Sequence, residues 1–276
     1  MIRPNSTDVH ARSPVSKRLA PLALIAAVLL LWQMMAVLQV YPVFIIPPPA
    51  AVLQKFVAVS LDGSLLHHSL VTLKAVLAGL AGGAVAGVAL GYLVARSALL
   101  EDALTPFVVA LQSTPIVAWA PLLVIWFGSG LTSKAITSAL IVFFPTFVNT
   151  VVGMRNVPAS LQDLLRVHRA TRWQVLTVLE IPAALPVLLG GLKISATLAV
   201  IGAVVGEFVS ADAGLGFLIT LARSRYDTPL VLVAVIALAV IARILYGIVS
   251  MLERRLLAWQ HSGTRASYLQ KGTFQE

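Results

Sequence analysis

Polar side chains that could do chemistry are concentrated in one internal segment, residues 156–182, between two long hydrophobic stretches. Ser160 is followed three residues later by Asp163, and Thr171 by Gln174. Both pairs fit the capping box, in which a hydroxyl accepts from the amide three residues on and an acid or amide side chain bonds back. The segment is therefore predicted to form two short helices.

Each predicted helix has one apolar face. Residues three or four positions apart lie on the same face of a helix. In the first helix this face consists of Leu161, Leu164, Leu165 and His168, and in the second of Trp173, Leu176, Thr177 and Glu180. Pro182 and Pro186 follow and are predicted to break the helix and to set the angle of the next hydrophobic stretch. Two interpretations stay open. The helices could lie on the lipid headgroups, or they could be the site through which a protein outside the bilayer binds and moves the spans.

A second polar group interrupts the middle of an apolar stretch: Gln112, Ser113, Thr114 and Pro115. Backbone carbonyls that lose their helical partners at this interruption, and the side-chain amide of Gln112, must face protein or a water-filled cavity at that depth. They could line a path for a polar solute, or form a kink that a neighbouring donor satisfies. Trp119 and Asn149 are further candidates for such a path.

The loop of residues 207–227 contains Glu207, Asp212 and the turn Gly214 to Gly216. It is predicted to form a short helix on the outer surface. It could contact a docking protein or close an outer gate, or it could be a plain connection. Residues 50–61, after three prolines, are also predicted to lie along the outer interface.

Several kinds of chemistry are excluded or unsupported. The chain has no cysteine, so disulfides and thiolate ligands are excluded. His67 and His68 are adjacent and would point about 100° apart on a helix, so they do not predict a metal site. No catalytic grouping and no phosphate-binding G-x-x-x-x-G-K-[ST] pattern is present. No catalytic, metal or cofactor-binding residue is predicted, and the scattered cations do not form a nucleic-acid surface.

The elements that must position these residues are membrane spans. Hydrophobic residues make up 59% of the chain and charged residues 11%, which is more apolar than a soluble core requires. Six stretches approach the roughly 20 residues that a bilayer needs: 19–40, 74–95, 103–127, 132–153, 184–206 and 228–250. The fold class is therefore all-α, a polytopic membrane protein with about six spans. The first stretch is too long for the apolar part of a signal peptide, so we expect it to be retained.

The positive charges predict the orientation, because cytoplasmic loops carry the excess of Lys and Arg. A cytoplasmic N-terminus places thirteen of the twenty cations inside and only Lys55, Lys134, Arg223 and Arg225 outside. The predicted organisation is a cytoplasmic tail (1–18), one transmembrane domain (19–253) and a second cytoplasmic tail (254–276).

Glycines repeat every four residues in the second predicted span: Gly79, Gly83, Gly87 and Gly91. This spacing lines them along one helix face, where another helix can approach closely. They could pack against a neighbouring span, or form a seam that slides during gating.

Residues 156–182 resemble the cytoplasmic loop of ABC importer permeases. That loop has the signature Glu-Ala-Ala, then Gly, then Ile-x-Leu-Pro. Asp163, Leu164 and Leu165 occupy the first three positions, Arg169 the glycine position and residues 179–182 the end. The spacing is kept, but Arg169 replaces a glycine that would allow a tight turn or a close approach.

The flanking sequence strengthens the resemblance across nearly the whole chain, in residues 111–115, 120–122, 125–128, 143–145, 170–174, 181–186 and 201–208. These stretches are similar to the branch that imports nitrate, sulfonates, taurine, the pyrimidine precursor of thiamine, or riboflavin. Residues 191–208 and 214–216 look most like the thiamine-precursor and riboflavin permeases.

The resemblance implies a permease subunit in the bacterial inner membrane. It implies cytoplasmic ABC ATPase subunits that bind ATP and Mg²⁺, an extracytoplasmic solute-binding protein and a second permease copy as partners, and no cofactor on this chain. The implied ATPase contacts are Asp163, Leu164, Leu165, Arg169, Ala170, Arg172, Trp173, Leu176, Leu179, Ile181 and Pro182. The transported molecule is predicted to be a thiamine-type pyrimidine or riboflavin, with sulfonate, taurine or nitrate as alternatives. An ion-coupled transporter or channel is a more distant alternative.

Overall fold

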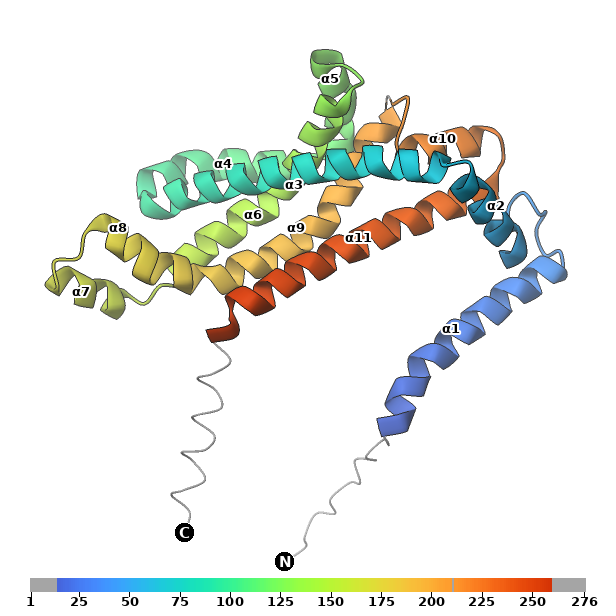
Figure 1. Ribbon diagram of the computed structural model, residues 1–276. Helices are drawn as coiled ribbons and strands as arrows, with labels where there is room; N and C mark the ends of the chain where they lie inside the picture. Colours follow the sequence, from blue (N-terminus) through green and yellow to red (C-terminus); the bar gives the residue numbers. More distant parts are fainter. Residues whose placement is uncertain (1–13, 210, 260–276) are drawn as a thin grey trace, which may run out of the picture.

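The computed structural model describes residues 14–209 and 211–259, and its regular elements in these ranges are all helices (Figure 1). In chain order they are α1 (Pro14–Val37), α2 (Pro49–Leu61), α3 (Ser64–Arg96), α4 (Ala98–Ser113), α5 (Ile116–Phe127), α6 (Leu131–Arg155), α7 (Ala159–Val167), α8 (Arg172–Gln174), the π-helix η1 (Val175–Glu180), α9 (Ile181–Val209), α10 (Leu215–Ser224) and α11 (Thr228–Leu256). Most of the two predicted tails lies outside these residues.

Four of the described helical stretches are long and apolar enough to cross a membrane: α3, α6, α11 and the continuous stretch Arg172–Val209. The pair α4 and α5 is a fifth if it is one bent span. The first predicted span corresponds to a shorter apolar helix, Leu22–Val37. The structure thus gives four to five spans by length and composition, where the sequence predicted six.

The predicted third span, 103–127, is not one straight helix. α4 and α5 meet at an angle of 96°. Thr114 is extended, with ψ at 129°, because the ring of the following Pro115 disfavours helical backbone in the residue before it. Two side-chain hydroxyls donate hydrogen bonds to backbone carbonyls at the end of α4. Ser113 donates to the Val109 carbonyl at 2.8 Å and Thr114 to the Ala110 carbonyl at 3.1 Å. The break therefore needs no donor from a neighbouring helix at these two carbonyls.

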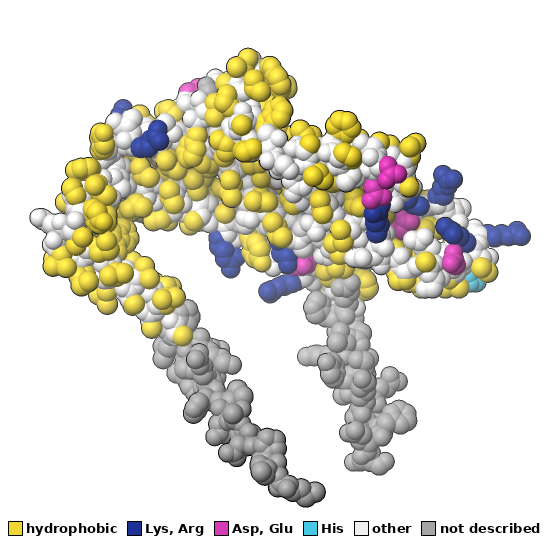
Figure 2. All heavy atoms as spheres, turned by 180° about the vertical axis from the view of Figure 1, so that it is seen from behind, with side chains coloured by type: hydrophobic (Ala, Val, Ile, Leu, Met, Phe, Trp, Pro, Cys, Tyr) yellow, Lys and Arg dark blue, Asp and Glu magenta, His cyan; other side chains and the backbone are white. Residues whose placement is uncertain are grey.

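The long helices lie side by side and give the molecule two ends (Figure 1). One end carries α7 and α8, the C-terminal ends of α3 and α6 and the start of α9, and the other carries α2, α10 and the start of α11. Hydrophobic side chains cover the sides between the ends, and Lys and Arg gather at the α7–α8 end (Figure 2). This distribution is typical of a bilayer protein.

Small side chains form the core between α3, α6, α9 and α11. It includes Ala75, Val142, Ala196, Ala199 and Ala203, which are all fully or almost fully buried. Buried hydroxyls join α6 to α9, as Ser138 donates to the Ala199 carbonyl at 2.9 Å. Such close packing and inter-helix hydrogen bonding replace the hydrophobic effect inside a membrane.

Candidate functional site

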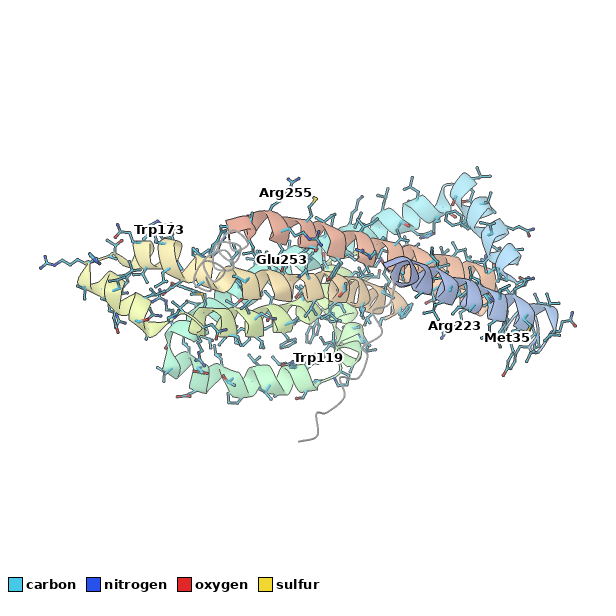
Figure 3. All side chains as sticks on the ribbon, turned by 90° about the horizontal axis from the view of Figure 1, so that it is seen from below. Met35, Trp119, Trp173, Arg223, Glu253 and Arg255 are labelled. Carbon is cyan, nitrogen blue, oxygen red and sulfur yellow. The ribbon has the colours of Figure 1, made fainter. Side chains whose placement is uncertain are left out.

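The loop between α6 and α9 forms an exposed lobe at one end of the molecule. No side chain of α7 or α8 is buried, although the lobe includes large apolar residues. Leu164 is 52% exposed and Trp173 is 70% exposed, and Figure 3 shows Trp173 near this end of the molecule. Leu165 and Leu176 are half-buried. The lobe is therefore a free, partly apolar surface.

One of the two predicted capping boxes is present. The Gln174 amide donates to the Thr171 hydroxyl at 3.3 Å, and the Thr171 amide donates to Oε1 of Gln174 at 2.8 Å. The box at Ser160 is wrong. α7 begins at Ala159 after Pro158, and Ser160 falls inside the first turn, where it does not cap the helix. Asp163 instead accepts from Arg166 at 3.2 Å.

Arg169 ends α7 in the conformation that glycine favours. Its φ is +52°, in the left-handed region. The Ala170 amide donates to the Leu165 carbonyl at 3.0 Å and the Arg169 amide to the Arg166 carbonyl at 2.9 Å, which are the two bonds of a Schellman motif. The tight turn that the family glycine allows is thus present, with an arginine in it.

The predicted break at Pro182 and Pro186 is also wrong. η1 ends with the Ile181 amide donating to the Leu176 carbonyl, five residues back. Helix α9 then continues over both prolines to Val209. A π-type turn changes the hydrogen-bond register just before Pro182, which has no amide donor, so the helix axis continues. Leu179 and Pro182 are half-buried, and Ile181 is exposed at 44%.

Glu180 is a residue of this site whose burial and partner the sequence did not predict. It is the last residue of η1, is only 4% exposed, and accepts from Arg96 Nη2 at 2.7 Å. Arg96 is the last residue of α3 and lies over the Tyr92 ring, 5.4 Å from its centre. Since 84 residues separate the partners, no local pattern could have indicated the pair.

The translocation-path candidates divide between two cavities. Gln112 and Asn149 line one of about 420 Å³, together with Phe144, Pro145 and Leu198. Trp119, on α5 (Figure 3), lines an adjoining apolar cavity of about 270 Å³, which shares Ile116 and Phe144 with the first. The structure therefore brings Gln112 and Asn149 to one cavity and Trp119 to its neighbour.

Thr114 and Pro115 form the break beside the first cavity, and Asn149 is partly engaged there. The Thr114 hydroxyl bonds its own helix, and Pro115 is the residue before α5. The Asn149 amide donates to the Pro145 carbonyl at 2.7 Å. Its side chain also packs on Gly191 of α9, where a Cβ would come within 2.6 Å of the amide nitrogen. The cavity thus has two amide side chains on walls from α4 and α6.

The glycine row of α3 lies against α6. A Cβ on Gly79, Gly83, Gly87 or Gly91 would come closer than 3 Å to atoms of α6. The opposing side chains also repeat every four residues: Ser138, Val142, Thr146 and Thr150. Gly202 and Gly206 of α9 also allow a close approach to α6, at Ser138 and Lys134. These two glycines have the four-residue spacing of the α3 row, but the α9 row has only two members, and it was not predicted from the sequence.

The outer-loop candidates separate into a buried cluster and one exposed acid. Glu207 is 1% exposed and accepts from Thr72 at 2.8 Å and from the Gly216 amide at 2.7 Å. Gly214 is buried as well and donates its amide to Nδ1 of His68 at 3.0 Å. Asp212 is exposed. Glu207, Gly214 and Gly216 therefore hold α10 in place, and of the four candidates only Asp212 offers its side chain to a partner.

Lys134 completes this buried cluster. It is 3% exposed and donates to the Ala213 carbonyl at 3.0 Å. Thr72 accepts from the Leu215 amide at 2.8 Å while it donates to Glu207. Side chains from α3, α6 and α9 thus form hydrogen bonds with backbone groups of the loop and of the first turn of α10. Such satisfied networks fix one arrangement of a buried segment.

The family model "Binding-protein-dependent transport system inner membrane component" matches residues 83–258. The riboflavin transport system permease RibX of Chloroflexus aurantiacus is 46% identical over 234 residues, which cover 85% of this chain and 87% of the relative. The aliphatic sulfonates transport permease SsuC of Bacillus subtilis is 33% identical, with 87% of each chain covered. Further relatives are named for formylaminopyrimidine, taurine and nitrate transport.

Solved structures show the same fold. An inward-facing structure of the MetNI methionine ABC transporter matches 71% of this chain and 98% of its own chain, with a TM-score of 0.61 at 16% identity. With its apolar spans, its exposed loop between α6 and α9 and these relatives, the chain belongs to the inner-membrane permeases of binding-protein-dependent ABC importers, in the riboflavin, thiamine-precursor, sulfonate, taurine and nitrate branch.

Proposed function

We propose that this permease forms the translocation path for a small heteroaromatic nutrient, riboflavin or a thiamine-type pyrimidine, that an extracytoplasmic binding protein delivers. The similarity to RibX supports riboflavin. The cavity with Gln112, Asn149 and Phe144 offers amide groups and one aromatic ring, which suit a flat ring with polar edges. The sulfonate relative makes a sulfonate the second candidate.

The exposed lobe is the observation that carries the proposed mechanism. Its apolar side chains are uncovered, while the Schellman turn and the capping box at Thr171 hold their helices in fixed positions. We expect α7 and α8 to insert into a cleft on a cytoplasmic ABC ATPase subunit, with Leu164 and Trp173 as buried anchors. ATP and Mg²⁺ bind on that subunit. Closure of an ATPase pair then moves two permease copies, a homodimer in this proposal, between inward-facing and outward-facing arrangements.

The test is purification of the tagged permease from native membranes in mild detergent, with mass spectrometry of the proteins and small molecules that accompany it. Recovery of an ATPase subunit and of a binding protein that carries riboflavin or a pyrimidine would support the proposal. A binding protein that carries taurine or another sulfonate would favour the second candidate. A chain that repeatedly purifies intact and alone would contradict the importer complex.

A further inference from the structure

Arg243 is a cation inside the last membrane span, α11, and it has no acidic partner in the described part of the chain. The acid that follows it on the helix, Glu253, lies ten residues on, about 15 Å along the axis, and is already paired with Lys193 at 2.7 Å. The Arg243 side chain makes no hydrogen bond to a described residue, and its charge contacts only the Tyr246 ring, 5.9 Å from the ring centre. A cation at this depth needs an anion or water to be stable.

Arg243 lies on the face of α11 that points away from the core. Positions 243, 247, 250 and 254 are spaced four, three and four apart, so they share one face of the helix. Leu245 and Val249 are buried in the core and lie on the opposite face. A groove of about 340 Å³ follows the outer face, and its lining residues all belong to α11: Arg243, Tyr246, Gly247, Ser250, Met251 and Arg254. This α11 groove therefore faces the surroundings of the bundle.

The Arg243 side chain runs along this groove toward the end of α11. A Cβ on Gly247 would lie 3.7 Å from Nη1 of Arg243, so the guanidinium is one helical turn beyond its own Cα. In a helix the Cα–Cβ bond tilts toward the N-terminus, and this side chain thus runs against the tilt. Long cationic side chains in a span take such a course to reach the polar headgroups.

The groove offers donors and no acid. Arg243 stands at one end and the exposed Arg254 at the other, with the hydroxyl of Ser250 between them. Guanidinium groups bind phosphate oxygens through two parallel hydrogen bonds. Tyr246 and Met251 add apolar surface at the sides of the groove. These groups suit a phosphate that carries acyl chains, and the two cations favour a lipid with a net negative charge.

A second copy of the chain is the other source from which an anion could come. The acids of the described spans are bonded within the chain, as Glu207 is to Thr72 and Glu253 to Lys193. Asp102 is exposed near the start of α4, but it stands at the end of a helix and not at the depth of Arg243. Lipid phosphates, in contrast, border the whole outer face of α11 at this end.

We propose that the α11 groove binds the headgroup of an anionic phospholipid from the leaflet at the α7–α8 end of the molecule. The phosphate lies at the level of Ser250 and accepts hydrogen bonds from Arg243 below it and from Arg254 at the membrane surface. Gly247 leaves the space through which the Arg243 guanidinium reaches it. This site takes neither nutrient nor nucleotide, so it does not rest on the proposed function.

The experiment uses the complete permease, purified in a neutral maltoside detergent and stripped of native lipid. Its midpoint of thermal unfolding is followed while dioleoylphosphatidylglycerol is added. We expect a saturable rise in the wild-type chain, and Arg243→Gln should raise the lipid concentration for half of the effect by about tenfold, because a hydrogen bond to a charged group is lost. Dioleoylphosphatidylcholine, which has no net charge, should give no such rise.

Arg255→Gln is the matched control for charge. Arg255 is exposed at the same end of α11 and does not line the groove, so its loss should leave the lipid effect unchanged. Gly247→Leu is the matched test for space, because it fills the groove and keeps every charge. It should weaken the lipid effect as Arg243→Gln does. Native mass spectrometry should likewise show phosphatidylglycerol retained by the wild-type chain and lost from both groove variants.

An unchanged lipid effect in Arg243→Gln overturns the inference. So does an equal loss in Arg255→Gln, because the lipid would then respond to surface charge in general. The same rise with inorganic phosphate at equal concentration would show an ion site and no lipid site. If Arg243→Gln and Asp102→Asn each separate the permease copies and neither changes the lipid effect, the anion belongs to the second copy. Should Arg243→Gln fail to purify, Gly247→Leu decides.

Discussion

Arg169 shows at the scale of one residue how a family position can change its side chain and keep its geometry. A left-handed conformation costs a non-glycine residue about 1–2 kcal/mol, and Arg169 bears that cost at φ +52°. Arg169→Gly should therefore raise the midpoint of thermal unfolding in detergent by about 2–4 °C. Arg166→Gly, in the helical part of α7, is the control and should lower it. A lower midpoint in Arg169→Gly would show that the arginine makes a compensating contact.

Glu207 is the second residue whose effect can be measured alone. Glu207→Gln replaces one carboxylate oxygen by a donor, so the Gly216 amide or the Thr72 hydroxyl loses its acceptor. A hydrogen bond to a charged group contributes about 1.5–3 kcal/mol, so α10 should open at least tenfold more often. Trypsin cleavage at the exposed Arg223 or Arg225 measures this opening. The control is Asp212→Asn, an exposed acid in the same loop. Equal cleavage of both variants would contradict the role assigned to Glu207.

At the scale of elements, the contact between α3 and α6 gives a prediction with an internal control. A Cβ on Gly83 would overlap the Ala139 carbonyl, whereas a Cβ on Gly82 lies 4.0 Å from its nearest neighbour, the Ala139 side chain. Gly83→Ala should destabilise the protein by about 1–3 kcal/mol, while Gly82→Ala should change stability little. Thermal unfolding of the two variants in one detergent makes the comparison. Similar midpoints would mean that α3 can move away from α6 at no cost.

Elements also show how far the sequence could predict this structure. Thr171 and Gln174 contain their capping box within four residues, so that helix start was predictable. The π-type turn was not predicted, and the burial of Glu180 at its end could not be, because the partner of Glu180 is Arg96, 84 residues away in the chain. The residues 112–115, three polar side chains and a proline, predicted a break but not its 96° angle. Asn149 and Gln112 were both candidates, but they lie on α6 and α4, and only the folded chain shows that they line one cavity, with Trp119 in the adjoining one.

At the scale of the whole molecule, the orientation in the bilayer can be tested directly, since the native chain offers no thiol. Leu61 at the end of α2 is 84% exposed, and Val167 on α7 is 79% exposed. With a cytoplasmic N-terminus, a membrane-impermeant maleimide should label Leu61→Cys in intact spheroplasts, and Val167→Cys only after permeabilisation. The reverse pattern would overturn the orientation and, with it, the docking of the lobe to a cytoplasmic ATPase.

The glycines of α3 and α9 that face α6 limit what can move. α6 is in backbone-distance contact with both helices, and Ser138 of α6 lies at a glycine position of each, Gly79 of α3 and Gly202 of α9. Sliding by less than a helical turn, about 5.4 Å, would press that side chain against the backbone of its neighbours. We therefore expect the three helices to move together as one plate. In the proposed homodimer, alternation between two access states would then come from rotation of this plate relative to the plate of the second subunit, with the hinges outside it.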